Sequence, residues 1–257
     1  MKSDLQGRAY IVTGGSRGFG FAIADNLIQH GARVGLLGRD AVSLNAAIEK
    51  LGTEHALAVT ADVADRKQPV AAFLRIKEHF GRLDGLVNNA GLARPGTVEN
   101  LIEEEVINQI NTNLAGTIFC CQAAISLLRG ADNPRIVNIS SASAHHYDEM
   151  AHLSVYAATK AAVERFSRDL RRELQVDGIG VTVVRPGGAA TDFASSWNEE
   201  RFAEALQAWQ AQGPDMDMGM DAQHVAETVS YCLSSPPGVA IDLLEVRPNT
   251  RSPKPIF

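Results

Sequence analysis

The chain lacks the features that mark several broad classes of protein. It has only three cysteines, Cys120, Cys121 and Cys232, without the spacing of a disulfide framework or of metal ligands. No apolar run approaches the ~20 residues that span a bilayer, and residues 1–7 hold no apolar core of a signal peptide. A formal net charge of −6 without a basic block is unlike a nucleic-acid-binding surface. We therefore expect a cytoplasmic protein with no metal, no membrane anchor and no nucleic-acid partner.

Apolar segments typical of strands alternate with amphipathic segments typical of helices along the whole chain. Strands are expected at 8–13, 33–38, 55–60, 85–87, 135–139, 180–184 and 241–249, and helices at 21–29, 42–51, 69–80, 101–128, 154–176 and 221–234. This alternation predicts a Rossmann-like doubly wound parallel sheet of about seven strands, flanked by helices on both faces. With 45% apolar residues and no internal repeat or linker, residues 1–257 are expected to form one domain.

The first predicted strand runs directly into a glycine-rich turn that opens an apolar helix. Glycines let the backbone approach a pyrophosphate, and the N-terminus of a helix supplies free N–H groups. Gly14, Gly18 and Gly20 are spaced Gly-x-x-x-Gly-x-Gly, which differs from the common Gly-x-Gly-x-x-Gly. Because strand and helix flank them, we expect a dinucleotide to bind here.

The residues after the second strand indicate which dinucleotide. In the common pattern, a carboxylate about 20 residues after the glycines binds the ribose 2′-hydroxyl. Gly38 occupies that place, and Arg39 follows it. A cation without the carboxylate suits a 2′-phosphate, and Arg17 in the glycine loop is a second cation within reach. NADP(H) is therefore expected rather than NAD, unless Asp40 pairs with Arg39 on the surface.

Tyr156 and Lys160 lie four residues apart on a predicted helix, so they share one face. A free phenol titrates near ~10, too high for acid–base work at neutral pH. A lysine ammonium about 5 Å away, at an effective dielectric near 20, lowers the phenol pKa by about two units, to near ~8. A positively charged nicotinamide would lower it further. The pair is a candidate acid and base.

Several polar or glycine-rich positions directly follow predicted strands: the glycine loop, Asp62, Asn89, Ser141 and Pro186. In doubly wound sheets, ligands bind outside the carboxyl ends of the strands. These positions are therefore expected to form one site.

Taken together, the motifs resemble the short-chain dehydrogenase/reductase family, in its compact single-domain branch. The resemblance covers residues 7 to about 195 and rests on the glycine loop after Thr13, Asn88–Asn89–Ala90–Gly91, Tyr156-x-x-x-Lys160, and Pro186–Gly187 with Thr191. With the cations noted above, it implies a set of cofactor contacts: Gly14, Ser16, Arg17, Gly18, Phe19, Gly20, Arg39, Asp62, Val63, Asn89, Ala90, Gly91, Tyr156, Lys160, Pro186, Gly187 and Thr191.

The resemblance also implies a catalytic tetrad of Asn113, Ser141, Tyr156 and Lys160. Asn113 matches a helix asparagine that holds a water in a proton relay, and Asn111 is the competing match. Ser141 precedes Tyr156 by a longer interval than is usual in the family, whereas Ser143 has the usual interval. We favour Ser141 because the sheet fixes a strand end, while a surface loop tolerates insertions.

The extra residues fall in a polar loop after Ser143, and residues 192–220 are a candidate lid over the site. These segments and the neighbouring strand end supply the side chains expected near a substrate: Ser143, His145, His146, Tyr147, Met150, Gly188, Phe193 and Trp197. A proline-rich tail, Pro253–Phe257, replaces the family's usual Asp–Gly–Gly ending. The family default is a homotetramer, and a homodimer is the alternative.

The resemblance implies an NADPH-dependent oxidoreductase that reduces a ketone or aldehyde to an alcohol, reversibly, with Tyr156 as general acid or base. One alternative is an NAD-dependent alcohol dehydrogenase of the same family. A second is a non-catalytic NADP-binding regulator. A third, a sugar-nucleotide epimerase or dehydratase, normally needs a longer chain. The partner is expected to be a small carbonyl compound, which fold and tetrad alone do not name.

Overall fold

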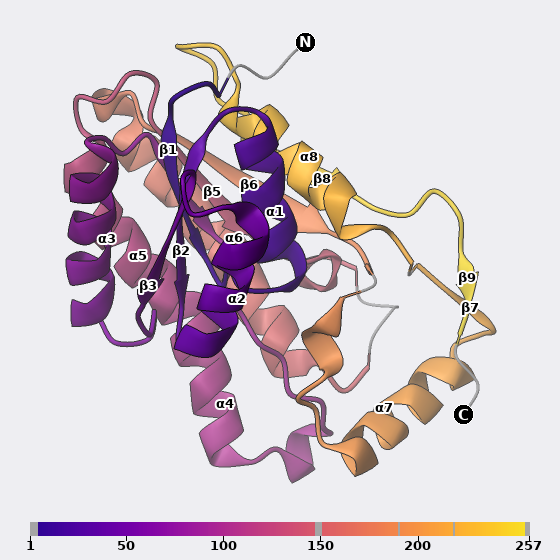
Figure 1. Cartoon of the computed structure of the whole chain (residues 1–257). Helices are drawn as coiled ribbons and strands as arrows, with labels where there is room; N and C mark the ends of the chain where they lie inside the picture. Colours follow the sequence, from indigo (N-terminus) through magenta and orange to yellow (C-terminus); the bar gives the residue numbers. More distant parts are fainter. Residues whose placement is uncertain (1–4, 147–150, 190, 218, 255–257) are drawn as a thin grey trace.

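The computed structural model describes residues 5–146, 151–189, 191–217 and 219–254. Its centre is a seven-stranded sheet in the order β3-β2-β1-β4-β5-β6-β8, in which all neighbouring strands are parallel (Figure 1). The strands are β1 (Ala9–Thr13), β2 (Arg33–Gly38), β3 (Ala56–Thr60), β4 (Gly85–Asn88), β5 (Arg135–Ile139), β6 (Gly180–Pro186) and β8 (Leu243–Val246). The chain winds outward from β1 in both directions, which confirms the predicted doubly wound sheet.

Helices cover both faces of this sheet (Figure 1). One face carries α1 (Gly18–Gln29), α2 (Ala41–Leu51) and α8 (Ala222–Leu233), and the other carries α3 (Lys67–Phe80), α5 (Gly116–Leu128) and α6 (Ser154–Glu173). In β1, Tyr10 and Val12 point into the first layer, while Ala9 and Ile11 point into the second. A central parallel strand is buried on both faces, which explains its continuously apolar sequence.

Two helices differ from the sequence prediction. α1 begins at Gly18, three residues before the predicted start, because the last two glycines of the loop lie inside its first turn. The helix predicted over 101–128 is divided into α4 (Glu103–Ile110) and α5 by a π-helical turn, Asn111–Ala115. Such turns inside helices are frequent at functional sites.

Beyond the carboxyl ends of the strands lie α4 and α7 (Glu199–Ala211), at the bottom of Figure 1. Next to α7, β7 (Asp215–Met216) pairs antiparallel with β9 (Ser252–Pro253), an arrangement that the sequence did not predict. The buried residues of a third apolar cluster lie at this end: Ala93, Leu153, Ala205, Leu206 and Trp209. Within the described ranges, no helix is long and apolar enough to cross a membrane.

Candidate active site

The glycine loop between β1 and α1 is packed so closely that its glycines are required. A Cβ on Gly20 would lie 2.1 Å from the carbonyl oxygen of Gly14, and one on Gly14 would lie 3.0 Å from the Cα of Ala90. Asn89 holds the loop, because its Nδ2 donates to the carbonyls of Thr13 and Gly14 at 3.0 and 3.2 Å. The loop is therefore a preformed backbone cradle that fits a pyrophosphate, and the Asn89 amide shapes it from the protein side.

The two cations expected at a 2′-phosphate have different surroundings. Arg39 is exposed directly after β2, and among the described residues it forms no ion pair. Asp40, the alternative surface partner of Arg39, caps α2 through two backbone N–H groups, which together with Ser43 lower the pKa of its carboxyl. Arg17 donates to Ser195 Oγ at 3.2 Å. Arg39 is thus free to meet a phosphate, whereas Arg17 joins the glycine loop to the segment before α7.

Three further residues expected to contact a dinucleotide lie along the same edge. Asp62 Oδ1 accepts from the backbone N–H two residues later at 2.9 Å, so one of its oxygens stabilises a turn. Val63 is buried, and a Cβ on Gly116 would come within 2.8 Å of its Cγ2. Thr191 lies beside the glycine loop, 3.7 Å from where Gly18 would carry a Cβ. The side chain of Val63 therefore packs in the core, leaving only its backbone for a ligand.

Other expected contacts are mainly backbone positions. Pro186 ends β6, the N–H of Gly187 donates to Val246 at 2.8 Å, and the carbonyl of Gly188 accepts from Met220 at 3.3 Å. Ser16 is half-buried in the glycine loop, and Phe19 packs against the core layer of α1.

Tyr156 and Lys160 stand at the start of α6, beside the end of β5. Lys160 Nζ donates to the carbonyl of Ile139 at 2.8 Å and lies 5.8 Å from the centroid of the Tyr156 ring. A Cβ on Gly91 would lie only 3.3 Å from the same ammonium nitrogen. The side chain of Ser141 hydrogen-bonds with that of Tyr156. The structure therefore brings the serine, the tyrosine and the lysine together at one strand end.

Burial governs the protonation of this pair. It raises the pKa of Tyr156 to about 12, although the hydrogen bond with Ser141 opposes the rise. It lowers the pKa of Lys160 to about 8. The expected lowering of the phenol pKa by lysine is therefore wrong for the protein by itself, because desolvation disfavours both charged forms and the ammonium is bonded to a carbonyl. In this structure the phenol is a proton donor.

Ser141 and Ser143 act as neighbours rather than as alternatives. Ser143 donates to Ser141 Oγ from its hydroxyl at 2.9 Å and from its backbone N–H at 3.3 Å. Ser141 lies two residues after the end of β5 and interacts with Tyr156, whereas Ser143 follows in a short 3₁₀ turn. This geometry supports Ser141 as the serine beside the reacting group, with Ser143 orienting it.

The loop after Ser143 makes a different contact from the one expected. His146 Nε2 pairs with Glu245 Oε1 of β8 at 2.6 Å, and the exposed His145 packs edge-on against His146. The imidazole of His146 is therefore engaged at β8 through Glu245, and a substrate contact of His145 or His146 stays a prediction. Tyr147 and Met150, also expected near a substrate, lie outside the described residues.

Asn113 is fully buried in the π-helical turn, whereas Asn111 is exposed. The Asn113 carboxamide accepts from the Leu92 N–H at 2.8 Å and donates to the Leu92 carbonyl at 2.9 Å and to Thr159 Oγ1 at 3.0 Å. Thr159 belongs to α6, so this side chain ties the loop after β4 to the helix of Tyr156. Both amide hydrogens are used within the protein, which makes Asn113 a positioning residue in this structure.

Aromatic rings connect Tyr156 with α7. The ring of Phe193 lies 5.5 Å from that of Tyr156, Trp197 lies 6.1 Å from Phe193, and Trp209 lies 6.4 Å from Trp197. We call these four rings the aromatic row. The structure thus places Phe193, a predicted substrate contact, beside Tyr156 and puts Trp197 one ring further away.

Ion pairs hold the segment that carries this row. Arg201 of α7 pairs with Glu105 of α4, and Arg94 lies 3.9 Å from the same carboxylate. Arg94 also donates to Ser196 Oγ at 3.3 Å. Residues 192–211 are therefore fastened to α4 and to the loop after β4, in a position that fits the predicted lid.

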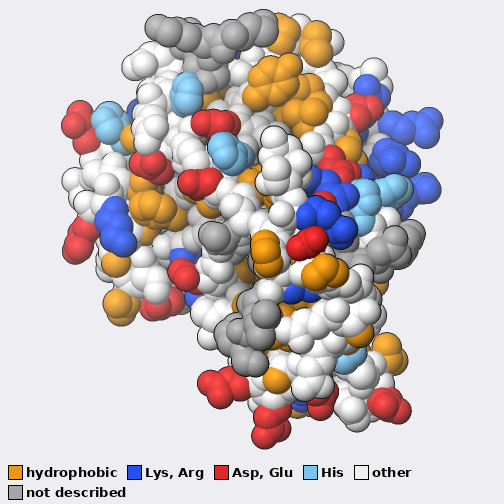
Figure 2. Space-filling model, turned by 90° about the vertical axis from the view of Figure 1, so that its right-hand side faces the viewer, with side chains coloured by type: hydrophobic (Ala, Val, Ile, Leu, Met, Phe, Trp, Pro, Cys, Tyr) orange, Lys and Arg blue, Asp and Glu red, His pale blue; other side chains and the backbone are white. Residues whose placement is uncertain are grey.

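The sequence did not predict the charged network around Arg185 of β6. Arg185 is only 8% exposed and donates to both carboxylate oxygens of Glu164 and to Glu245. These bonds raise its pKa. Ser140 donates to Glu164 at 2.7 Å, so the network reaches α6, the helix of Tyr156 and Lys160. Figure 2 shows basic, acidic and histidine side chains together on the face of the molecule that it presents. The sequence did hold one indication of this network: an arginine inside an apolar strand. Arginine is seldom buried without a partner.

Two observations concern metals and thiols. Among the described residues, no group of three His, Cys, Asp or Glu side chains is placed to hold a metal ion. Cys120, Cys121 and Cys232 are buried and unpaired, and burial raises the pKa of each thiol.

Comparison with known proteins agrees with this geometry. The family model described as short chain dehydrogenase matches residues 8–201. A 3-oxoacyl-[acyl-carrier-protein] reductase of Bos taurus is 35% identical over 209 residues, which cover 78% of this chain and 87% of that protein. The closed form of serine dehydrogenase complexed with NADP+ aligns with a TM-score of 0.82 and 28% identity, over 97% of this chain and 98% of that one. A 3-ketoacyl-(acyl-carrier-protein) reductase from Brucella melitensis complexed with NADH aligns with a TM-score of 0.81 and 25% identity, over 95% and 98%.

Proposed function

Because the chain belongs to the short-chain dehydrogenase family, and is an oxidoreductase of that family, we propose that it uses NADPH to reduce a ketone or aldehyde to an alcohol, reversibly. One observation carries the proposal: Tyr156, hydrogen-bonded with Ser141 and close to Lys160, stands at the strand ends that also form the glycine cradle. Added side chains at Gly14 and Gly20 would collide with the backbone of the loop and of Ala90, so the turn requires glycines, as a backbone cradle for a pyrophosphate does.

NADPH, when bound, supplies the hydride. Ser141 donates a hydrogen bond to the carbonyl oxygen, and Tyr156 gives its proton to the oxygen as negative charge develops there. A phenol whose pKa is raised to about 12 is protonated at neutral pH, which suits it to this donation. Lys160 would hold the ribose hydroxyls of the bound cofactor and would return a proton to Tyr156 through a water next to Asn113. Asn113 fixes the helix that carries both residues through Thr159.

The preference for NADPH rests on Arg39. Its guanidinium stands after β2 without an ion pair among the described residues, while Asp40 caps α2. An NAD-dependent version of the same reaction is the second candidate. It is favoured by Arg17, which in this structure is bonded to Ser195 instead of facing the place of a 2′-phosphate.

A panel of carbonyl compounds, followed by the absorbance of NADPH and of NADH, tests the proposal. We expect NADPH oxidation with at least one ketone or aldehyde, and a higher kcat/KM with NADPH than with NADH. Tight NADPH binding without oxidation by any carbonyl in a broad panel would instead favour a non-catalytic regulator.

We also propose that copies of this chain form a homodimer or homotetramer. Around α4, Ile102, Ile107 and Ile110 are 47%, 47% and 39% exposed, and a second copy of the chain would cover these apolar side chains. Light scattering of the purified protein tests the proposal, and a monomeric mass at micromolar concentration would contradict it.

A further inference from the structure

The chain beyond β8 runs back to α7 and pairs with the segment that follows this helix. Figure 1 shows the yellow C-terminal segment reaching α7, where β9 lies beside β7. The backbone N–H of Lys254 continues this pairing by donating to the carbonyl of Pro214 at 2.8 Å. We call residues 247–254 the C-terminal clasp. Its contacts with 209–217 join the end of the chain to the predicted lid.

The ammonium of Lys254 is the most specific contact of the clasp. Lys254 is only 8% exposed, and its Nζ donates to the carbonyl of Trp209 and, at 2.7 Å, to that of Gly213. These carbonyls lie at the C-terminal end of α7, where backbone acceptors lack helical partners and the helix dipole favours a cation. A lysine is rarely this buried unless it is paired. Lys254 therefore fixes the end of α7 rather than merely covering it.

Trp209 relays this contact toward the catalytic tyrosine. Its backbone carbonyl binds Lys254, while its indole Nε1 donates to the carbonyl of Ala151 at 2.7 Å, shortly before α6. Its ring belongs to the aromatic row that ends at Tyr156. A shift of Trp209 would therefore change the positions of Trp197 and Phe193, the rings that lie between it and Tyr156.

A second attachment joins the clasp to the charged network. Arg247 pairs with Asp217 after β7, and its other guanidinium nitrogen lies 3.6 Å from Glu245, the partner of Arg185. Arg251 lies 3.4 Å from the same Asp217 carboxylate. Two routes thus connect the clasp with α6: one through Trp209 and one through the network around Arg185.

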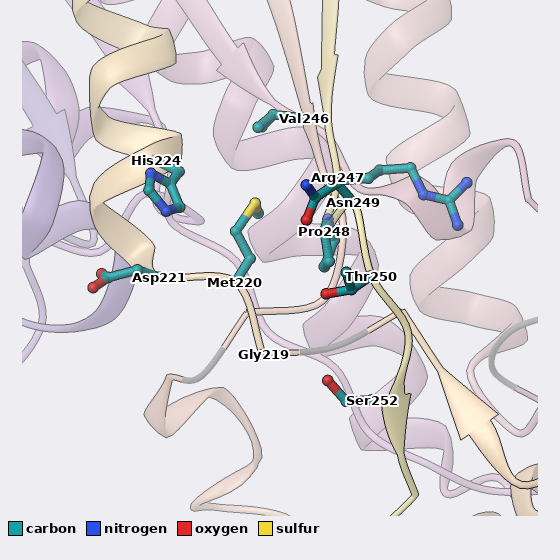
Figure 3. A pocket seen from close by; sticks show the side chains of 10 residues that line it. All are labelled: Gly219, Met220, Asp221, His224, Val246, Arg247, Pro248, Asn249, Thr250 and Ser252. Atoms are coloured by element: carbon teal, nitrogen blue, oxygen red, sulfur yellow. The ribbon is translucent and has the colours of Figure 1, made fainter.

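The clasp has little apolar packing of its own on the α8 side. A cavity of about 480 Å³ separates it from the start of α8, with Met220 and His224 on one side and residues of the clasp on the other. Figure 3 shows the side chain of Arg247 extending away from Met220 and His224, on the far side of the strand. The polar contacts of the clasp therefore add to the apolar packing of Ala205, Leu206 and Trp209, which holds the other side of α7.

We propose that Lys254 is a positioning residue for the carbonyl substrate, acting through Trp209 to hold α7 and the other rings of the aromatic row beside Tyr156. The inference rests on the proposed function, because it takes residues 192–217 to be the lid of a reductase. It assigns to the C-terminal tail, which departs from the family pattern, the task of fixing that lid.

The full-length Lys254→Met variant tests the proposal, because it keeps the length of the side chain and removes the ammonium. Lys77→Met is the matched control, since Lys77 Nζ donates to the Leu127 carbonyl at the end of α5 in the same way, away from α7. Thermal unfolding shows whether each variant is folded. The first readout is acrylamide quenching of tryptophan fluorescence, which reports only on the lid because the two tryptophans of the chain are Trp197 and Trp209.

We expect Lys254→Met to increase quenching and to shift the emission to the red, while Lys77→Met leaves both unchanged. With an active carbonyl substrate, Lys254→Met should raise KM by roughly tenfold, the effect of losing a charged hydrogen bond, while the KM for NADPH and kcat change far less. Lys254→Arg, which keeps N–H donors at this place, should restore part of the loss.

Quenching equal to that of the control, in a folded variant, would overturn the inference. A wild-type protein that reduces no carbonyl would defeat the proposed function alone, because the quenching comparison would still decide the inference.

Discussion

The two halves of the candidate site are held by different forces. The strand-end half, from the glycine loop to Lys160, is fixed by backbone packing and by buried amide and hydroxyl bonds such as those of Asn89 and Asn113. The lid half, which is the proposed lid over residues 192–217, is held by the apolar packing of α7 and by charged side chains from distant parts of the chain, such as Glu105 and Lys254. The contacts of the strand-end half are part of the packed sheet, whereas the charged contacts of the lid half can be removed one at a time by substitution.

This difference assigns a different task to each half. A reaction that needs reacting atoms within a few tenths of an ångström requires a preformed frame, and the strand ends provide it. Substrate entry requires a cover that opens, and partly exposed polar contacts release more easily than a packed core. Substitutions in the first half should therefore affect cofactor binding and chemistry, while those in the second should affect mainly substrate KM.

The largest effect on cofactor binding should follow from distorting the glycine cradle. In Gly20→Ala, the new Cβ meets the Gly14 carbonyl at 2.1 Å, so the loop must move. We expect the Kd for NADPH, measured by fluorescence titration, to rise roughly 100-fold, the upper range for overpacking. A folded variant with unaltered NADPH affinity would show that the cradle is not the cofactor site.

The second prediction concerns stability and pH. Burial lowers the pKa of Lys160 from 10.5 to about 8, so between these values the unfolded chain holds a proton that the folded protein has lost. This group therefore contributes stability above pH 10.5 that is lost as the pH falls toward 8, by on the order of 3 kcal/mol. Relative to wild type, Lys160→Met should gain stability as the pH is lowered through this window. Denaturant unfolding at pH 8 and at pH 10.5 measures the difference, and parallel pH dependence of the two proteins would contradict it.

A smaller effect is expected at the outer edge of the strand-end half. Arg39→Ala should raise the Kd for NADPH by roughly tenfold, the loss of one charged hydrogen bond, and leave that for NADH nearly unchanged. Competition titrations with both dinucleotides measure the ratio. Equal weakening of the two would place Arg39 away from the 2′-phosphate.

The smallest predicted effect is in the lid half. Arg201→Met removes the pair with Glu105, whose two side chains are 19% and 24% exposed, and should raise the substrate KM by about threefold. Arg165→Met, which removes the more exposed pair with Asp169 on α6, is the control and should leave KM unchanged. If both variants behave alike, the Arg201 pair does not hold the lid.

The sequence predicted the strand-end half well because its signals are local. Glycine or proline beside an apolar run marks β1, β2 and β5 within one residue. Tyr156 and Lys160 share a face because helical spacing puts them there. The predicted lowering of the Tyr156 pKa was wrong because burial raises this pKa. Burial depends on the whole fold, and it outweighs one neighbouring cation.

The lid half was less predictable because its contacts join residues far apart in the chain. Nothing near Lys254 indicates that it reaches the end of α7, and nothing near Glu105 indicates Arg201 as its partner. The π-helical turn at Asn113 was likewise hidden inside continuous helical periodicity. Such contacts follow only once the sheet order has brought the segments together.

Tyr156→Phe tests most directly the claim that this phenol is the proton donor of a carbonyl reductase. The substitution keeps the ring against Phe193 and removes only the hydroxyl. With an active carbonyl substrate, we predict that kcat falls by about 10²- to 10⁴-fold while the Kd for NADPH stays within about twofold of wild type. Turnover close to that of wild type in this variant would contradict the account.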